Sequence, residues 1–209
     1  MSRLFAYGCS NTYGEALEDC WTGEQHGLEP SKFAWPQLLA DQMNLECVNL
    51  GFPGVSNKYI CNKVSNTEFQ KGDKVVILWT FFNRFCFFRD DGSSQRMLVG
   101  DADRKNLDKV TSLKSRFYYG HFYSKKDSID DSFLRINFIK NYLDSEGIEN
   151  YHYTCVSKDF LHKLKPLLWN KVDLKFIDFR GFPLALDNQH PGVEAQEYAA
   201  KTMFNDINK

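Results

Sequence analysis

Short apolar segments alternate with amphipathic segments along most of the chain. The most pronounced apolar segment is DKVVILW at 73–79, which holds five consecutive apolar residues and follows Lys71 and Gly72. A bounded run of this length, enriched in β-branched residues, predicts a buried strand. Shorter segments of the same kind, which predict further strands, lie at 3–7, 45–50, 150–156 and 173–179.

Helical patterns fill the intervals between these strands. The last of them, at 191–208, begins with Pro191 and places Val193, Met203 and Ile207 on one face. Similar segments lie at 32–43, 57–70, 131–143 and 158–169. Strands that alternate with helices predict an α/β domain whose mostly parallel sheet is covered on both faces. We therefore expect a three-layer α/β/α sandwich.

One segment, about residues 84–130, interrupts this alternation. It contains Gly92, Gly100 and Gly120, many charged residues and the aromatic patch RFYYGHFY. A segment of this length without regular patterning is usually functional or flexible. Because we find no repeats and no second domain, we expect a single domain over residues 1–209 with an insertion here. The insertion could serve as a lid, as an interface or as a platform for the substrate, and the sequence does not decide between these roles.

Composition and charge narrow the classes of function. The net charge of −1 offers no basic footprint for nucleic acid, and no apolar window is long enough to predict a membrane span. The six cysteines have neither CxxC nor metal-ligand spacing, so we expect no metal and no cofactor. Without a recognisable secretion signal the expected location is the cytoplasm, although a virion protein would have the same features.

The stretch GCSNTYG, directly after the first predicted strand, offers the first candidate for chemistry. Ligands of such sheets bind at the carboxyl ends of the strands, and a serine in a strand-to-helix turn can present its hydroxyl there. Ser10 is therefore a candidate nucleophile, with Gly8 easing the tight backbone. Serine is also a common helix cap, and this stretch alone favours the cap.

The stretch DNQHPG supplies a candidate base. His190 follows Asp187 by three residues, a spacing that lets the carboxylate reach the imidazole and fix its tautomer. The second ring nitrogen is then available to take a proton from a serine. The alternative is an ordinary surface turn with Pro191 at the first helical position. The other histidines, which lack such a neighbour, are His26, His121, His152 and His162.

Together these stretches resemble the sequence blocks of the SGNH hydrolases, also called GDSL-type esterases and lipases. GCSNTYG is similar to the first block, NLGFPGVSN to the second, and DNQHPG to the last, in the family's order. The resemblance implies a flavodoxin-like α/β/α sandwich. It also implies Ser10 as nucleophile, His190 as general base and Asp187 as the carboxylate that orients His190.

The resemblance further implies three oxyanion donors: the backbone N–H groups of Ser10 and Gly54 and the side-chain amide of Asn83. Two departures from the family pattern affect these blocks. Cys9 stands where the family has aspartate, and Thr80 stands at the glycine of the third block. Asn83 follows one residue later than a gapless match would place it.

The expected function is hydrolysis of an ester through an acyl-enzyme. The preferred substrate is a small O-acyl group, such as acetyl, on a carbohydrate or related small molecule. Two alternatives remain open: a non-catalytic module that binds carbohydrate through its aromatic insertion, and an acyltransferase that uses the same residues. Aromatic residues make up 15% of the chain, which fits both a Phe-rich core and an aromatic-lined groove. The sequence leaves the oligomeric state open.

Overall fold

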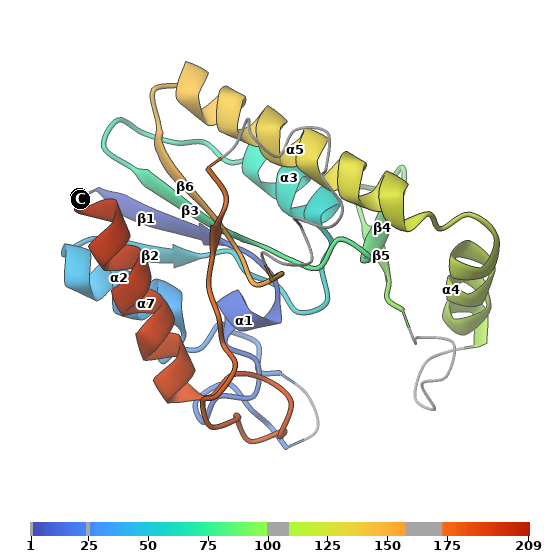
Figure 1. Ribbon diagram of the computed structural model, residues 1–209, viewed down its shortest axis with the longest axis horizontal. Helices are drawn as coiled ribbons and strands as arrows, with labels where there is room; N and C mark the ends of the chain where they lie inside the picture. Colours follow the sequence, from blue (N-terminus) through green and yellow to red (C-terminus); the bar gives the residue numbers. More distant parts are fainter. Residues whose placement is uncertain (1, 24–25, 100–108, 158–172) are drawn as a thin grey trace.

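The computed structural model describes residues 2–23, 26–99, 109–157 and 173–209. Its centre is a five-stranded sheet in the order β2-β1-β3-β6-β7, in which all neighbouring strands run parallel (Figure 1). The strands are β1 Arg3–Tyr7, β2 Glu46–Asn49, β3 Lys74–Trp79, β6 Glu149–Thr154 and β7 Lys175–Phe176. Four lie within the segments predicted from the apolar pattern and β6 begins one residue before its segment, so the expected parallel sheet is confirmed.

Helices cover both faces of the sheet (Figure 1). The helices α2 Trp35–Met43 and α7 Val193–Ile207 cover one face, and α3 Asn57–Ser65 and α5 Lys125–Ser145 cover the other. Side chains of a strand alternate between the two faces. In β3, for example, Val76 and Leu78 pack with α2 and α7, while Val75, Ile77 and Trp79 pack with α3 and α5. The three-layer α/β/α class is confirmed.

Some helix boundaries differ from the sequence prediction. The helix α3 begins after Ser56, whose hydroxyl accepts a hydrogen bond from the Tyr59 N–H at 3.3 Å, and it ends at Ser65 rather than near residue 70. The helix α5 extends beyond 131–143 at both ends: it begins after its capping serine, Ser124, and ends at Ser145. The helix predicted at 158–169 lies outside the described residues.

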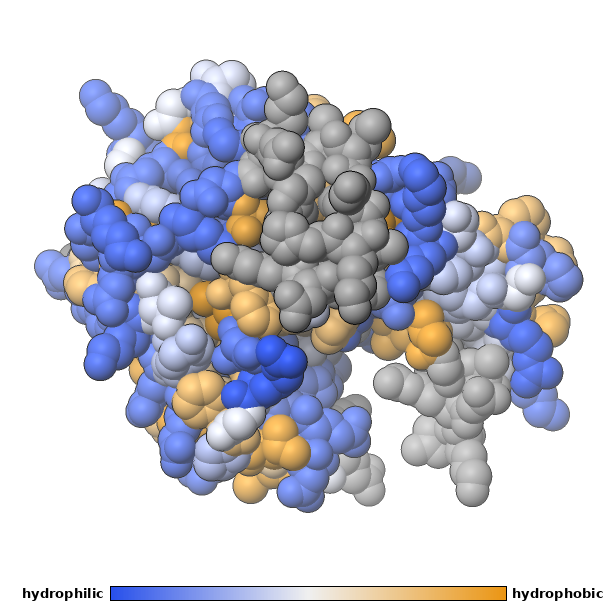
Figure 2. Space-filling model, in the orientation of Figure 1, coloured by the Kyte–Doolittle hydropathy of each residue, from blue (hydrophilic) through white to orange (hydrophobic). Residues whose placement is uncertain are grey.

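The insertion contains a hairpin and a helix. The antiparallel strands β4 Phe85–Phe88 and β5 Ser94–Met97 form the hairpin, and α4 Lys109–His121 follows it. Both lie to the right of the main sheet in Figure 1. Figure 2 shows hydrophobic residues on the surface over α4, where Leu113 and Phe117 are exposed.

Several interactions join α4 to the hairpin, among them hydrogen bonds of 3.3 Å that link Gln95 to Thr111 and to Lys114. The rings of Phe85 and Tyr118 stack with centroids 4.3 Å apart. The Tyr119 hydroxyl lies 2.7 Å from the carbonyl oxygen of Asn83 and 2.9 Å from that of Met97, at the open end of the hairpin where β4 begins and β5 ends. The described part of the insertion is therefore an ordered unit attached to the sheet. Within the described residues no helix is long and apolar enough to cross a bilayer.

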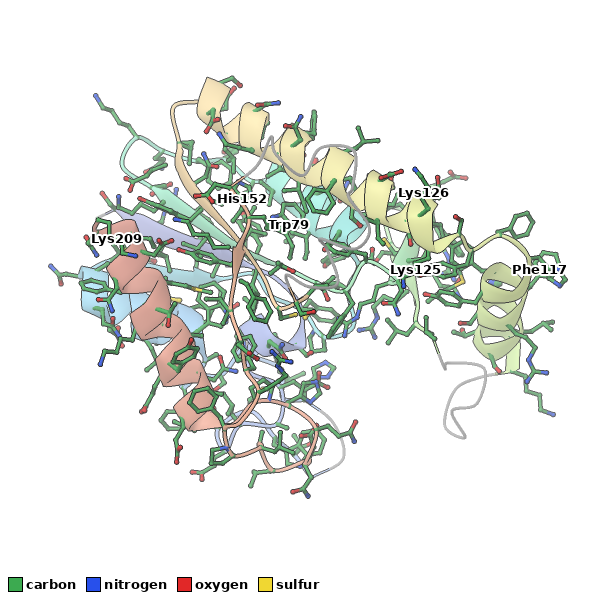
Figure 3. The ribbon with its side chains drawn as sticks, viewed as in Figure 1. Trp79, Phe117, Lys125, Lys126, His152 and Lys209 are labelled. Carbon is green, nitrogen blue, oxygen red and sulfur yellow. The ribbon has the colours of Figure 1, made fainter. Side chains whose placement is uncertain are left out.

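A buried polar pair lies on the face of the sheet that α3 and α5 cover. Figure 3 shows Trp79 of β3 beside His152 of β6 there. The Trp79 indole N–H donates to His152 Nδ1 at 3.0 Å, and the rings stack nearly in parallel. The other ring nitrogen, Nε2, lies 2.9 Å from Asn150 Oδ1. Burial, reinforced by the positive charge of Lys140, lowers the pKa of His152 to about 3. This histidine is therefore neutral and structural.

Candidate active site

A cleft of about 470 Å³ lies at the carboxyl ends of the central strands. In the strand order the chain changes direction between β1 and β3, and ligands of open α/β sheets bind at such a switch point. The loops that line the cleft follow β1, β2 and β3 and precede α7. The lining residues are Ser10, Glu15, His26, Pro53, Gly54, Arg84, Arg89, Ser94, Gln95, Arg96, Leu98, Thr111 and His190.

Ser10 lies at the first turn after the first strand. The strand β1 ends at Tyr7, Cys9 is the N-cap, and the short helix α1 Ser10–Tyr13 begins with the serine itself. The first N–H groups of a helix have no partner within it, so they are available to an oxygen in the cleft. The Ser10 side chain is mostly covered rather than exposed on the lip, since the residue keeps 4% of its accessible surface. Its hydroxyl contacts Cys9 Sγ at 3.9 Å.

Asn49, the last residue of β2, links the serine loop, which follows β1 and contains Ser10, to the loop after β2. Its Nδ2 donates to the Thr12 carbonyl at 2.7 Å, and its Oδ1 accepts from the Gly51 N–H at 3.0 Å. A side chain on Gly51 would collide with α1, because its Cβ would lie 2.8 Å from the Tyr13 nitrogen. Sequence reasoning did not assign this positioning role. The available signal is an asparagine at a strand end, directly before a glycine turn.

Gly54 lines the same cleft as Ser10. Its φ of 73° falls in the left-handed region that favours glycine. An added Cβ would lie 3.0 Å from Arg96 Nη1. Within the described residues its N–H has no hydrogen-bond acceptor. The structure therefore leaves a second backbone donor available in the same cleft as Ser10.

Asp187 and His190 form a close pair. His190 Nδ1 lies 2.6 Å from Asp187 Oδ2, while Asp187 Oδ1 accepts the backbone N–H groups of Gln189 and His190 at 3.0 Å each. Burial alone would raise the pKa of the Asp187 carboxyl, but these hydrogen bonds outweigh it and lower the pKa. Asp187 therefore stays ionised at neutral pH and holds Nδ1 as a donor, which points Nε2 away from it.

The Asp187–His190 loop is anchored to the serine loop. The Ala185 N–H donates to the His190 carbonyl at 2.9 Å and closes the turn. The Leu186 N–H donates to the carbonyl of Ala16, just beyond α1, at 3.1 Å. Two segments that are far apart in the sequence are thereby held side by side.

Glu15 is a site residue that sequence reasoning missed. Its Oε2 lies 3.4 Å from His190 Nε2, and its Oε1 lies 3.8 Å from Nδ1 of His26. His190 therefore has a carboxylate at each ring nitrogen. His26, which the sequence did not single out, also lines the cleft. The spacing from Ser10 to Glu15 matches no known motif, so no signal in the sequence marked either residue.

Asn83 does not lie with the other expected donors. Its side chain is exposed and lines a separate cavity with Phe81, Tyr123 and Cys155. The following residue, Arg84, lines the cleft instead. The structure thus brings Ser10, Gly54 and His190 to one cleft, with Asp187 behind the histidine, and leaves Asn83 outside it. The physical reason is that residues 81–84 form a turn closed by the Arg84 N–H bond to the Phe81 carbonyl at 3.2 Å.

The strand order and the layers define a three-layer α/β/α fold with a parallel central sheet. Comparison with solved structures gives the same class. The chain is similar in fold to an acetyl xylan esterase from the rumen bacterium Butyrivibrio proteoclasticus, with a TM-score of 0.57 and 13% identity over 99% of this chain. It is also similar to the M. smegmatis aryl esterase, with a TM-score of 0.51 and 11% identity, over 100% of this chain and 99% of that one.

A third similar structure is a family 2 carbohydrate esterase with a carbohydrate-binding domain from Corynascus thermopiles (Myceliophthora fergusii), with a TM-score of 0.57 and 9% identity over 99% of this chain. This chain covers 63% of the length of the acetyl xylan esterase and 65% of the Corynascus enzyme. At such identities the likeness shows the fold. No protein-family model matches the sequence, and no curated protein matches it significantly.

Proposed function

We propose that this protein is a serine ester hydrolase that works through an acyl-enzyme. The single observation that carries the proposal is the cleft at the switch point, which Ser10, Gly54 and His190 all line. Asp187 supports His190 from behind at 2.6 Å. A hydroxyl, an oriented imidazole and backbone donors are the parts that acyl transfer requires.

In the first half-reaction, Ser10 Oγ attacks the ester carbonyl carbon while His190 Nε2 takes the hydroxyl proton. The carbonyl oxygen becomes an oxyanion, which accepts hydrogen bonds from the N–H groups of Ser10 and Gly54. The intermediate collapses to the acyl-serine, and His190 gives its proton to the departing alkoxide, so an alcohol leaves. Asp187 stabilises the imidazolium in between.

In the second half-reaction, His190 Nε2 takes a proton from water, whose oxygen attacks the acyl-serine. The Ser10–acyl bond breaks, the carboxylic acid leaves, and the proton returns to Ser10. An alcohol acceptor in place of water would make the protein an acyltransferase. Product analysis with and without an added sugar separates these two outcomes.

The proposed substrate is a small acyl ester of a carbohydrate or similar molecule. Support comes from the structural neighbours, which include an acetyl xylan esterase and a family 2 carbohydrate esterase. The polar lining of the cleft fits a hydrated alcohol part better than a long lipid chain.

Labelling with a fluorophosphonate tests the activated serine directly. We expect mass spectrometry of the digested protein to find the label on Ser10. The label should be lost in Ser10→Ala and His190→Gln and kept in Ser94→Ala, a serine of the same cleft. His26→Gln is the matched histidine control and should also keep the label. Labelling in His190→Gln at the normal rate would contradict the assigned base.

Hydrolysis of a generic aryl acetate tests turnover and the third donor. We expect Ser10→Ala to abolish it. Removal of one oxyanion donor typically lowers kcat on the order of 10²–10³. A loss of that size in Asn83→Ala would assign the third donor to Asn83 despite its position; a smaller loss would leave the role to the two backbone groups.

One observation favours a second candidate, a non-catalytic module that binds carbohydrate. His190 Nε2 faces Glu15 at 3.4 Å, while the Ser10 hydroxyl contacts Cys9. In this arrangement the base is engaged by an acid rather than by the serine. A folded protein that neither takes the label nor hydrolyses aryl acetates, but binds oligosaccharide in the cleft, would establish this alternative.

A further inference from the structure

The cleft carries an uneven distribution of charge. Arg84, Arg89 and Arg96 line it on the side of the β4–β5 hairpin. Among its described lining residues Glu15 is the sole carboxylate, and it lies on the α1 side, engaged with His190 and His26. The hairpin side therefore presents positive charge to whatever the cleft binds.

Two of these arginines, Arg84 and Arg89, form no ion pair within the described residues, although the charge of Arg89 helps to lower the pKa of the nearby, fully exposed Asp91. Arg84 Nη1 lies 3.5 Å from the Val55 carbonyl, and its guanidinium lies over the Phe81 ring at 5.1 Å. Arg89 Nη2 donates to Gln95 Oε1 at 3.0 Å.

Several arginines elsewhere in the molecule have the carboxylate partner that Arg84 and Arg89 lack. Arg3 is paired with Asp73, Arg135 with Asp131 and Arg180 with Asp178, each at 2.6–2.7 Å. The guanidinium fork suits the two oxygens of a carboxylate or the oxygens of a phosphate. In a substrate cleft, a guanidinium without such a partner is a site for an anionic oxygen group of the substrate.

We propose that the substrate of this cleft is an ester whose alcohol part carries an anionic oxygen group, bound by Arg84 and Arg89. The anion belongs to the alcohol part because the acyl group proposed above is small and lies over Ser10. This inference rests on the proposed function for its ester and on the arginines for its charge. It makes the natural substrate an acidic molecule rather than a neutral sugar ester.

A matched pair of esters tests the proposal. The probes are 4-acetoxybenzoate and its neutral methyl ester, which share the acetyl group and the ring. After correction by their rates of hydrolysis in hydroxide alone, we expect kcat/KM to be on the order of tenfold higher for the anion, equivalent to about 1.4 kcal/mol. Arg84→Gln and Arg89→Gln should each reduce this ratio severalfold. Arg116→Gln, an exposed arginine on α4, is the control and should leave the ratio unchanged.

A binding measurement keeps this test separate from the hydrolase proposal. The Ser10→Ala protein is titrated calorimetrically with 4-acetoxybenzoate and with its methyl ester. Tighter binding of the anion, weakened by salt and by Arg89→Gln, supports the inference even if neither ester is turned over. Hydrolysis of both esters at the same corrected rate, or equal affinity for both, would overturn it and leave the hydrolase proposal intact.

Discussion

His190 lies between two carboxylates that make different contributions. Asp187 is close, at 2.6 Å from Nδ1, and is itself held by two backbone N–H groups. Glu15 is more distant, at 3.4 Å from Nε2, the nitrogen that would receive the serine proton. In the proposed mechanism Asp187 therefore orients the ring, whereas Glu15 would have to move away from Nε2 for the ring to bond to Ser10.

Substitution of these two acids should have unequal effects. Asp187→Asn removes the charge that fixes the tautomer, so we expect kcat for an aryl acetate to fall on the order of 10⁴-fold. Glu15→Gln should change kcat less than tenfold, because it leaves the Asp187–His190 pair intact. Steady-state kinetics of both variants, with thermal melts to confirm folding, measure this. Equal losses would contradict the division of roles.

Gly8 is a residue whose lack of a side chain the structure requires. A Cβ there would lie 2.0 Å from Thr12 Oγ1 and 2.9 Å from the Leu78 carbonyl oxygen. We expect Gly8→Ala to lower the free energy of unfolding by about 1–3 kcal/mol, as overpacking does, and to slow labelling of Ser10. Denaturant unfolding measures the first effect.

Gly120 in α4 is the matched control, because a Cβ there has no described atom within 4 Å. Gly120→Ala should raise stability by about 0.5–1 kcal/mol, since alanine favours a helix. A loss of stability in Gly120→Ala equal to that in Gly8→Ala would remove steric collision as the explanation.

At the scale of elements, one hydroxyl of α4 contacts the open end of the hairpin, where β4 begins and β5 ends. The Tyr119 hydroxyl lies within hydrogen-bond distance of the carbonyl oxygens of Asn83 and Met97 there. We expect Tyr119→Phe to increase amide hydrogen exchange in β4 and β5, because the two carbonyl oxygens lose the one hydroxyl proton that they share, at a cost of about 1 kcal/mol. Exchange in β1 and β3 should stay unchanged. An unaltered hairpin would show that its other contacts, among them the Phe85–Tyr118 stack, suffice.

The elements differ in how far the sequence predicted them. The strand β3 was predictable because its five apolar residues are buried on both faces, and α7 because its apolar face has the helical period. The hairpin was not, since FCFF and SQRM lack alternation and pair only with each other. Its arginines therefore gave no sign in the sequence of lining the same cleft as Ser10.

The residues of the candidate site also differ in how far the sequence predicted them. Ser10, Gly54, Asp187 and His190 were predictable because each stands in a recognisable block beside a strand or helix. Glu15 and the arginines enter the cleft through loop geometry, which local patterns do not encode. Asn83 was expected in the cleft, but the turn that ends at Arg84 directs its side chain elsewhere.

For the whole molecule, the buried His152 links stability to pH. Its pKa falls from the ordinary value of 6.5 to about 3 in the folded protein. Between these values the unfolded chain binds a proton that the folded one does not. The free energy of unfolding therefore falls as pH drops through this window, by at most about 1.4 kcal/mol per pH unit from this residue.

Urea unfolding at pH 7, 6, 5 and 4 checks this dependence. His152→Gln lowers stability at pH 7 but should show a shallower loss towards pH 4. The difference between the two proteins should therefore shrink as the pH falls. A constant difference would mean that His152 is already protonated in the folded state or is not responsible for the acid sensitivity.

The bond between the Leu186 N–H and the Ala16 carbonyl has a consequence for timing. A ribosome makes Ser10 before any of the sheet except β1, and makes His190 only after all five strands. During synthesis Ser10 is therefore present long before its proposed base. The proposed site forms only when the loop of Asp187 and His190 packs against the loop after α1. Refolding from urea has the same requirement, because Ser10 is activated only after the two loops are in contact. We therefore expect labelling of Ser10 to recover later than the sheet, so that the labelling rate reports the last step of folding.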